Sequence, residues 1–338
     1  MSGPLYAGVD LGGTKILVLI TDEQGKVLAE DRVLTHAAEG PNAVIARIAE
    51  AVRGAASAAG VEIDALAAGG VSAPGPIDAS AGVITQPPNL PGWHDVPLAR
   101  LLHEQLDAPF VLENDANCGC VGEHLFGAGK GLHDLVFVTV STGIGGGIII
   151  DDRLYVGASG AAGEVGHMVI SRTGPKCGAG HVGCLEAFAS GTAIAARAEE
   201  AIAQGRLPRT ARLAEHNPPL TAETVYLAAQ QGEEEAYGMI RDAGSYLGLG
   251  LASIVNAFNP QAIVLGGGLT NMGDMLLRPA VDTARERSFA QSFADVRIIE
   301  GELGERAAAL GAVAVARQRQ AGGAEAAADA TRVVSGGR

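Results

Sequence analysis

A strand-and-turn pattern that occurs twice is the feature that most constrains the fold. Residues 5–34 alternate β-favouring runs with two turn signals, at Gly12-Gly13 and at Glu23-Gln24-Gly25, which predicts a three-stranded meander. Residues 134–157 repeat the order of strand, glycine turn, strand, short turn and strand, although few residues are identical. This repeat predicts a duplicated unit, one copy per domain, and we expect both glycine turns to face a shared cleft.

The length of the chain also favours two domains, because single cores stop growing at about 250–300 residues and this chain has 338. Hydrophobic residues make up 47% of it, enough for a sizeable core. The net charge of −14 repels nucleic-acid phosphates and anionic lipids, so we expect neither nucleic acid nor membrane as a partner. A nucleotide stays compatible, because it arrives with magnesium and meets local backbone dipoles.

The amino-terminal residues give no sign of export. No basic patch precedes an apolar run there, and no apolar run approaches the roughly 18 residues of a spanning helix. Four cysteines in a long chain of this kind are expected to stay reduced. We therefore predict a cytoplasmic protein.

Hydrophobic periodicity predicts further elements along the chain. Helices are expected at 41–59, 98–106, 191–203, 221–231 and 233–256, with strands from Ala65 and over 109–114. Residues 87–97 are too proline-rich for regular structure, and 261–268 form the last predicted strand. A terminal helix over 305–317 is expected to cross back to the first domain. The predicted domains are 1–117 with 304–320, and 118–303, followed by a disordered tail over 321–338 that is poor in large apolar residues.

Three glycine-rich turns follow predicted strands, at residues 10–15, 141–147 and 266–268. Glycine lets backbone N–H groups converge on phosphate oxygens, and nearby hydroxyl and ammonium groups add donors. A single turn of this kind is more often a plain hairpin, but three of them on a duplicated unit favour phosphate binding. The chain has neither the P-loop motif nor a dinucleotide fingerprint. The sequence therefore predicts a nucleotide held between two domains.

Two aspartates end predicted strands. Asp10 lies beside the first glycine turn, where a carboxylate would position magnesium directly or through water. Asp115 has no glycine cradle beside it and is the better candidate for a catalytic base. The alternative for each is a simple turn or helix cap. Cys118 and Cys120 resemble a ligand pair, but burial at a helix start explains them better.

The stretch from 163 to 186 gathers carboxylates, imidazoles and thiols between glycines. His167, Cys177 and Cys184 supply three of the four ligands that a structural zinc requires, and His181 is a fourth candidate. The spacing is not one of the common zinc patterns. The alternative is a glycine-rich surface loop with reduced thiols and solvated histidines.

Five motifs in this order resemble the ROK family of sugar kinases, most of all its bacterial glucokinases. They are Asp10-Leu-Gly-Gly-Thr-Lys15, Glu113-Asn-Asp-Ala-Asn117, Thr142-Gly-Ile-Gly-Gly-Gly147, Glu164-Val-Gly-His167 and Gly183-Cys-Leu-Glu186. The resemblance implies an α/β, actin-like ATPase (ribonuclease-H-like) fold of two domains, with duplicated βββαβαβα units and a cleft between them. It implies transfer of the ATP γ-phosphate, with Mg²⁺, to the 6-hydroxyl of glucose.

The resemblance also implies roles for individual residues. Asp115 would be the catalytic base that accepts the proton of the attacking hydroxyl. The sugar would contact Gly75, Asn89, Asn114, Asp115, Glu164, His167 and Glu186. ATP would contact Asp10, Gly12, Gly13, Thr14, Lys15, Thr142, Gly143, Gly145, Gly146, Gly267 and Gly268. The family's zinc knuckle has one histidine and three cysteines, and here Ala179 replaces the middle cysteine. His181 or water would then complete the site, or the loop would stand without zinc.

Several alternatives stay open at the level of sequence. N-acetylglucosamine, N-acetylmannosamine, mannose and fructose are other acceptors within the family, and polyphosphate is another donor. The family includes transcriptional repressors, which carry a helix-turn-helix before the first strand, and here the first strand begins by Leu5. An actin-like scaffold or chaperone ATPase would leave Glu164, His167 and Glu186 without a role. A homodimer or tetramer is expected only by analogy.

Overall fold

The computed structural model describes residues 3–335, with side chains for residues 3–321, and the chain divides into two units. Unit 1 comprises Met1–Lys130 and Glu305–Arg338, and unit 2 comprises Gly131–Gly304. Each unit contains one five-stranded sheet. The chain thus enters unit 2 once and returns to unit 1 with its last helix.

The sheet of unit 1 begins as the predicted meander. Its strands lie in the order β3 (Val27–Leu34), β2 (Lys15–Asp22), β1 (Leu5–Leu11), β4 (Leu66–Ala73) and β7 (Phe110–Asn114). The first three strands are antiparallel, whereas β4 runs parallel to β1 and β7 runs parallel to β4. The carboxyl ends of β1, β4 and β7 therefore lie at one edge of the sheet, where α/β proteins place their ligands.

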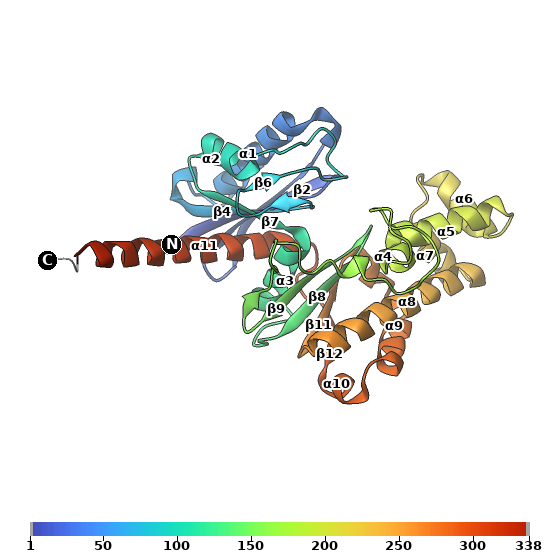
Figure 1. Ribbon diagram of the computed structural model, residues 1–338. Coiled ribbons are helices and arrows are strands. Elements are labelled where there is room, and N and C mark those ends of the chain that lie inside the picture. Colours follow the sequence, from blue (N-terminus) through green and yellow to red (C-terminus); the bar gives the residue numbers. More distant parts are fainter. Residues whose placement is uncertain (1–2, 336–338) are drawn as a thin grey trace. The chain divides into compact units, whose positions relative to one another are not determined.

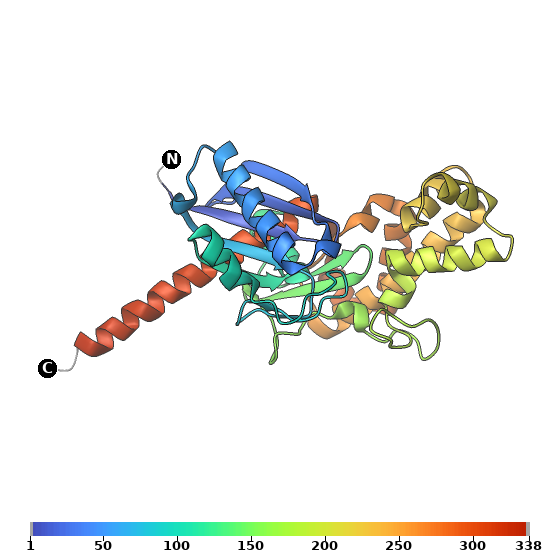
Figure 2. The same ribbon diagram turned by 90° about the horizontal axis from the view of Figure 1, so that it is seen from above.

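Helices cover both faces of this sheet (Figure 1). On one face, α1 (Pro41–Ala58) and α2 (Leu98–Leu106) bury a core of aliphatic residues against the strands. On the other face, α3 (Asp115–Phe126) and α11 (Ala307–Ser335) pack on β1, β4 and β7. Figure 2 shows α1 running along the sheet from a second direction. Strands β1 and β4 are thus buried from both sides, as their near-continuous apolar runs require.

The boundary between the units differs from the predicted one at residue 117. Helix α3 belongs to unit 1, because it packs closely along α11. A Cβ at Gly122 would lie 2.2 Å from the carbonyl oxygen of Ala307, and one at Gly311 would lie 1.7 Å from that of Cys118. These glycines let the two backbones meet. Cys118 and Cys120 are buried in this packing, in agreement with the prediction of core cysteines.

The sheet of unit 2 has the same strand order and directions as that of unit 1. Its strands are β10 (Arg153–Leu154), β9 (Ile144–Ile150), β8 (Leu135–Val140), β11 (Ala262–Gly266) and β12 (Arg297–Glu300). Strands β8, β9 and β10 are antiparallel, and β11 and β12 continue in parallel. The duplication predicted from the two meanders is confirmed, and it extends to all five strands. The sequence prediction ended at β11 and missed β12, a short strand with little burial.

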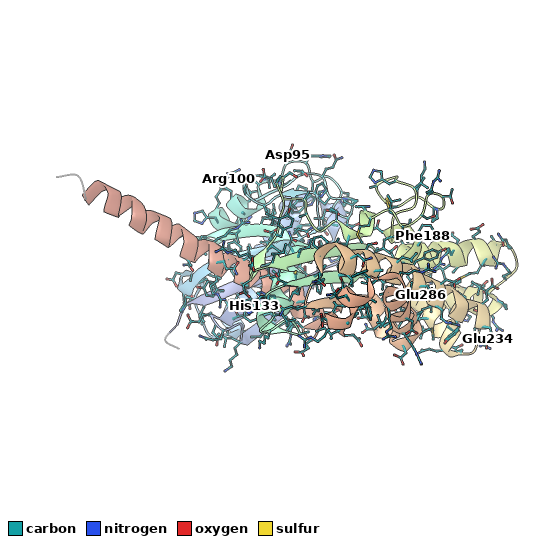
Figure 3. The ribbon with its side chains drawn as sticks, turned by 60° about the horizontal axis from the view of Figure 1, so that its bottom comes forward. Asp95, Arg100, His133, Phe188, Glu234 and Glu286 are labelled. Carbon is teal, nitrogen blue, oxygen red and sulfur yellow. The ribbon has the colours of Figure 1, made fainter. Side chains whose placement is uncertain are left out.

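Helices gather over the sheet of unit 2 and form most of its core with β8, β9 and β11. They are α4 (Glu186–Ala189), α5 (Gly191–Ala203), α6 (Pro208–His216), α7 (Ala222–Gln230), α8 (Glu234–Phe258), α9 (Asp274–Arg287) and α10 (Ala290–Asp295). The long helix α8 packs along α9, and Gly244 and Gly248 let it approach the carbonyl oxygens of Leu276 and Ala280. Figure 3 labels Phe188 of α4, whose ring lies 4.5 Å from that of Tyr246 in α8.

Short elements complete the chain. The 3₁₀ helices are Ala37–Glu39, Ile63–Ala65, Val165–His167, Gly268–Met272 and Gly304–Arg306, and a two-stranded ribbon joins β5 (Ile77–Asp78) to β6 (Val83–Ile84). The predicted disordered tail over 321–338 differs from the structure, which continues α11 to Ser335 because the segment is rich in alanine, the strongest helix former. Residues 336–338 lie outside the described part. None of the helices in residues 3–335 combines the length and apolar content needed to cross a membrane.

Candidate active site

In unit 1, the carboxyl edge of the sheet carries Asp10 and Asp115. Asp10 is the last but one residue of β1 and pairs in register with Ser72 of β4. The Ser72 hydroxyl donates a hydrogen bond of 2.9 Å to Oδ1 of Asp10. Asp115 begins α3, directly after β7, the neighbour of β4. The parallel register therefore brings together two aspartates that are distant in the sequence.

The Asp10 carboxyl has a perturbed acidity. Burial, with a smaller contribution from the nearby Asp115 carboxylate, raises its pKa from the ordinary value of 3.8 to about 6, against the lowering effects of the Ser72 hydrogen bond and the Lys15 ammonium. In the protein alone, the anionic form of Asp10 is thus less stable than it would be in water. A cation beside it would stabilise the anion, so this carboxyl fits a magnesium ligand, which is a hard oxygen donor.

The helix that begins at Asp115 is well capped. The Asn114 side chain accepts hydrogen bonds from the backbone N–H groups of Ala116 (3.0 Å) and Asn117 (3.2 Å). Oδ1 of Asp115 also accepts from the Ala116 N–H, at 2.8 Å, yet the residue stays exposed. A carboxylate fixed at a helix N-terminus and open to solvent can accept a proton from a bound hydroxyl.

Two further residues predicted to bind the sugar lie beside these elements. A Cβ at Gly75 would lie 3.5 Å from Nδ2 of Asn114, and one at Gly13 would lie 3.0 Å from the carbonyl oxygen of Asn89. Gly75 is thus a neighbour of the Asn114 cap, and Asn89 is a neighbour of the first glycine turn. The structure therefore places Gly75 with Asn114, and Asn89 with the turn at 12–14.

The first glycine turn is closed by backbone bonds. The N–H of Gly12 donates to the Lys15 carbonyl oxygen at 3.0 Å, and the Thr35 hydroxyl donates to the Gly12 carbonyl oxygen at 2.7 Å. The ammonium of Lys15 forms an ion pair with Glu305, which also pairs with Arg32. Lys15 and Glu305 are both exposed, so this pair can exchange its partners easily.

In unit 2, the second glycine turn joins β8 to β9 at residues 141–143. The N–H of Ser141 donates to the Gly143 carbonyl oxygen at 2.9 Å, and the first residues of α5 attach to the turn. There, the N–H of Gly191 donates to the Ser141 carbonyl oxygen at 2.8 Å, and the Thr192 hydroxyl donates to that of Thr142 at 3.0 Å. The turn is thus fixed at the N-terminal end of a thirteen-residue helix.

Glu186 contacts this turn. Its Oε2 atom accepts a hydrogen bond of 3.1 Å from the N–H of Ile144 and would lie 2.6 Å from a Cβ at Gly143. The sequence assigned Glu186 to the sugar and Gly143 to ATP. The structure makes them direct neighbours, which places the carboxylate next to the turn predicted to hold phosphate.

Gly145 and Gly146 occupy a different position from the one expected. Both lie within β9, paired with Thr139 and Val138 of β8, and not in the turn. A Cβ at Gly146 would lie 2.8 Å from Cγ2 of Val165 and 2.9 Å from the carbonyl oxygen of Gly163. The glycine is therefore required where the segment that carries Glu164 and His167 packs on the strand.

The third glycine turn lies next to the second one. Gly267 follows β11, which runs parallel to β8, and it has a positive φ of 89°. A Cβ on it would lie 2.4 Å from the Val140 carbonyl oxygen, so only glycine fits. Residues 141–143 and 267–268 thus share the carboxyl edge of one sheet, which is where α/β sheets bind their ligands.

The cysteines and histidines of the 163–186 stretch form one cluster. The ligand atoms of His167, Cys177, His181 and Cys184 all lie within 4.8 Å of one another. Nδ1 of His167 lies 3.6 Å from Sγ of Cys177, and Nε2 lies 3.9 Å from Oε2 of Glu164. A tetrahedral zinc with bonds of about 2.0–2.3 Å holds its ligands about 3.3–3.8 Å apart. The cluster needs only small movements to fit such an ion.

The thiols of this cluster differ in acidity. Burial by itself would raise the pKa of Cys177, but backbone hydrogen bonds at His181 and Ala179, with side-chain bonds from Cys184 and His167, bring its pKa below the ordinary value. Burial and the neighbouring Cys177 raise the pKa of Cys184. One thiol is thus prepared for the thiolate form that binds metal. The donor set of two sulfurs and two imidazoles suits zinc.

Sequence reasoning missed three residues of these sites: Ser72, Glu113 and Thr192. Ser72 holds Asp10, and Glu113 accepts hydrogen bonds from the N–H of Asn114 and from Nδ2 of Asn117, both at 3.0 Å. Glu113 is part of a motif noted from sequence, but its burial inside unit 1 appears only in the structure. Ser72 and Thr192 have no sequence signal of their own.

Comparisons with known proteins place this geometry in context. Residues 6–319 match the ROK family. The glucokinase of Thermotoga maritima is 35% identical over 316 residues, which cover 93% of this chain and 98% of that protein. A xylose repressor of Caldicellulosiruptor bescii is 30% identical over 308 residues, which cover 91% of this chain but 77% of the repressor. The family therefore includes enzymes and regulators that resemble this chain.

Solved structures agree with the sequence matches. The ROK hexokinase of Thermus thermophilus superposes with a TM-score of 0.80 at 36% identity, over 93% of this chain and 98% of that one. A ROK family glucokinase from Streptomyces griseus, solved in complex with glucose and AMPPNP, also has a TM-score of 0.80, at 33% identity, over 93% of this chain and 99% of that one. The chain belongs to the ROK family and has the actin-like ATPase fold of its sugar kinases.

Proposed function

We propose that this protein transfers the γ-phosphate of ATP to the 6-hydroxyl of glucose. At the coarser level the chain is a hexokinase-type sugar kinase, because glucokinases 35–36% identical to it match most of its length. Glucose is the finer assignment. It is supported by the names of these relatives and by the glucose complex of the S. griseus enzyme.

The observation that carries the proposal is the placement of Asp115. Asp115 is exposed at the carboxyl edge of the parallel strands β1, β4 and β7, beside the Asn114 cap and Gly75. Phosphoryl transfer requires mainly positioning, charge neutralisation and a proton acceptor. In the proposal, Asn114 and Gly75 position the sugar, and Asp115 accepts the proton of the attacking hydroxyl. A regulator that only binds sugar has no need of such a base.

In this proposal, Asp10 and the glycine turns bind the nucleotide and its magnesium ion. Asp10 would hold Mg²⁺ directly or through water, and the turns at 12–14, 141–143 and 267–268 would offer backbone N–H groups to phosphate oxygens and adenosine. Magnesium supplies positive charge beside the transferred phosphoryl group. Lys15 is a further cation at the first turn, and exchange of Glu305 for a phosphate would leave its charge compensated.

In the proposal, unit 2 binds the sugar hydroxyls through three side chains, those of Glu164, His167 and Glu186. Nε2 of His167 faces Glu164, whereas Nδ1 faces the Cys177 thiol. The two ring nitrogens can therefore serve a hydroxyl and a metal separately. Carboxylates and imidazole are the side chains that hydrogen-bond vicinal hydroxyls well.

A panel of acceptors tests the function. Purified protein is supplied with Mg²⁺, ATP or polyphosphate, and glucose, mannose, fructose, N-acetylglucosamine or N-acetylmannosamine, and the sugar phosphate is quantified. We expect the highest kcat/KM for glucose with ATP. A higher value for another sugar or for polyphosphate would correct the substrate, and no turnover on any of them would refute the kinase assignment.

We also propose a structural zinc held by His167, Cys177, His181 and Cys184, with His181 replacing the thiolate lost at Ala179. Elemental analysis of protein purified without chelator should give about one zinc per chain, the number expected for one tetrahedral site. The variants His181→Ala and Cys184→Ala should lose most of it. Cys118→Ala is the matched control, because this buried thiol lies outside the cluster. Zinc-free parent protein would refute the site.

A further inference from the structure

The last helix contributes an arginine to the site region of unit 1. Arg319 lies on α11, and its guanidinium forms two interactions with different parts of the chain. Nη1 donates to the carbonyl oxygen of Ala79 at 2.8 Å, and Nη2 lies 3.4 Å from Oε2 of Glu113. A planar guanidinium can hold two acceptors at fixed directions, which an ammonium does less well.

The two segments that Arg319 joins both carry proposed sugar contacts. Gly75 precedes the short β5–β6 ribbon, and Ala79 lies in the turn between its two strands. Glu113 directly precedes Asn114 and Asp115. The two segments also meet each other, because a Cβ at Gly75 would lie 3.5 Å from Nδ2 of Asn114. One side chain from the end of the chain thus spans the segments that would position the sugar and the base.

Glu113 requires a cation because it is buried. It is 6% exposed, and its Oε1 atom accepts hydrogen bonds from the Asn114 N–H and from Nδ2 of Asn117. Its negative charge adds to those of Asp10 and Asp115. Burial, and then the negative charges of these three carboxylates, raise the pKa of the Cys118 thiol. A buried carboxylate without a counterion is costly, and Arg319 is the cation that the structure pairs with it.

We propose that Arg319 is a positioning residue for phosphoryl transfer. By pairing with Glu113 and holding Ala79, it fixes the Asn114 cap, the direction of Asp115 and the ribbon after Gly75. Arg319 does not touch the substrate in this proposal, and it acts through the residues that do. The inference rests on the proposed function, since the sugar contacts are part of it.

Other contacts keep α11 in place without Arg319. The amide of Gln320 donates to the Ala67 carbonyl oxygen at 3.2 Å and accepts from the Tyr6 hydroxyl at 3.2 Å. Arg317 donates to the carbonyl oxygen of Glu23. A variant at Arg319 should therefore keep the helix docked. Arg317 is the matched control, because it is an arginine on the same helix that bonds a distant backbone carbonyl.

The first experiment compares Arg319→Met with Arg317→Met in the full-length protein. For Arg319→Met we expect kcat to fall about tenfold and KM for glucose to rise about tenfold, because a misplacement of about 1 Å costs up to a hundredfold in rate. KM for ATP should stay within about twofold, since the glycine turns are held by other contacts. A smaller active fraction would lower the apparent kcat alone and leave KM for glucose unchanged. Arg319→Lys should recover part of the loss.

The second experiment removes both charges. A lone buried carboxylate costs more than the loss of the pair, so Glu113→Gln combined with Arg319→Met should be more active than Arg319→Met. Kinetic constants of Arg319→Met equal to those of Arg317→Met would overturn the proposal. So would a double variant that is no more active than Arg319→Met alone.

Hydrogen exchange separates this inference from the kinase assignment, because it needs no turnover. Peptides covering 76–84 and 110–117 should exchange faster in Arg319→Met than in Arg317→Met. Thermal unfolding curves check that both variants are folded. A parent protein without kinase activity but with this exchange difference would refute the function and keep the positioning role. Equal exchange in both variants would refute the positioning role itself.

Discussion

The two five-stranded sheets have the same strand order and directions, but their carboxyl edges carry different chemistry. The edge in unit 1 has the acids Asp10 and Asp115, with buried Glu113 behind them. The edge in unit 2 has two glycine turns and the N-terminal end of α5, with Glu186 beside the first turn. In unit 1 the edge combines titratable side chains with the glycine turn at 12–14, and in unit 2 it is built mainly of glycine turns and a helix N-terminus.

This difference shows that two copies of one scaffold can carry different functional groups at the same edge. Strand register fixes where each edge lies, whereas the residues after each strand are free to change. Unit 1 carries carboxylates, which can accept protons. Unit 2 contains close approaches of one backbone segment to another, for which Gly146 and Gly267 leave room. The comparison predicts that substitutions at the first edge change chemistry and that substitutions at the second change geometry.

The largest effect is expected from Asp115→Asn, which keeps the size of the side chain and removes the base. We expect kcat to fall by about 10³-fold, within the range of general-base contributions, with glucose affinity by calorimetry almost unchanged. Asp95→Asn is the matched control, because Asp95 is an exposed loop residue with a positive φ that asparagine also tolerates (Figure 3). Turnover of Asp115→Asn within tenfold of the parent would refute the base assignment.

A geometric change at the second edge should have the next largest effect. In Gly143→Ala the new Cβ would lie 2.6 Å from Oε2 of Glu186, so the carboxylate must move and its bond to the Ile144 N–H weakens. We expect kcat/KM to fall by about ten- to a hundredfold, as for a displacement near 1 Å. Gly238→Ala is the control, since its Cβ would meet nothing within 4 Å and helix α8 favours alanine. Equal activity of both variants would contradict the role of the turn.

The smallest effect concerns stability. The folded state raises the pKa of Asp10 from 3.8 to about 6, so it binds this proton more tightly than the unfolded chain does. The free energy of unfolding therefore falls as the pH rises from about 3.8 to above 6. In chelator, Asp10→Asn should stabilise the protein by about 3 kcal/mol at pH 7.5 and by about 0.5 kcal/mol at pH 4, since the shift of the pKa from 3.8 to about 6 costs about 1.4 kcal/mol per unit.

Urea unfolding at both pH values measures this difference. Asp78→Asn should not stabilise the protein at pH 7.5, because hydrogen bonds from Ser80 and Ala81 lower the pKa of Asp78. A stabilisation by Asp10→Asn that is the same at both pH values would show that folding does not raise the pKa of Asp10. It would then weaken the argument for a cation beside Asp10.

Much of the fold could be predicted from local patterns. Helices α2 and α5 have the predicted bounds, because their apolar residues recur at helical spacing between clear stop signals. Strand β12 was missed, because its register with β11 depends on a partner far away in the sequence. The predicted boundary after residue 117 differs from the division in the structure for the same reason, since only the packing of α3 on α11 assigns α3 to unit 1.

The candidate site was predicted unevenly. Asp10, Asp115 and the glycines at 12–13 follow strands, so their place at a sheet edge could be read from the chain. The packing role of Gly146 could not, because it depends on the 163–167 segment that lies over β9. The neighbourhood of Glu186 and Gly143 likewise joins residues that are far apart in sequence.

The sequence alone determined the type of protein: a duplicated strand pattern, glycine turns after strands, an acid at the end of a strand, and a cysteine and histidine stretch. These are local signals, because turn, strand and capping preferences act over a few residues. Only the tertiary structure decided which residues touch. It paired Ser72 with Asp10, Glu186 with the second turn and Arg319 with Glu113. Such pairs form between distant segments, where sheet register and helix packing, and no local preference, bring the side chains together.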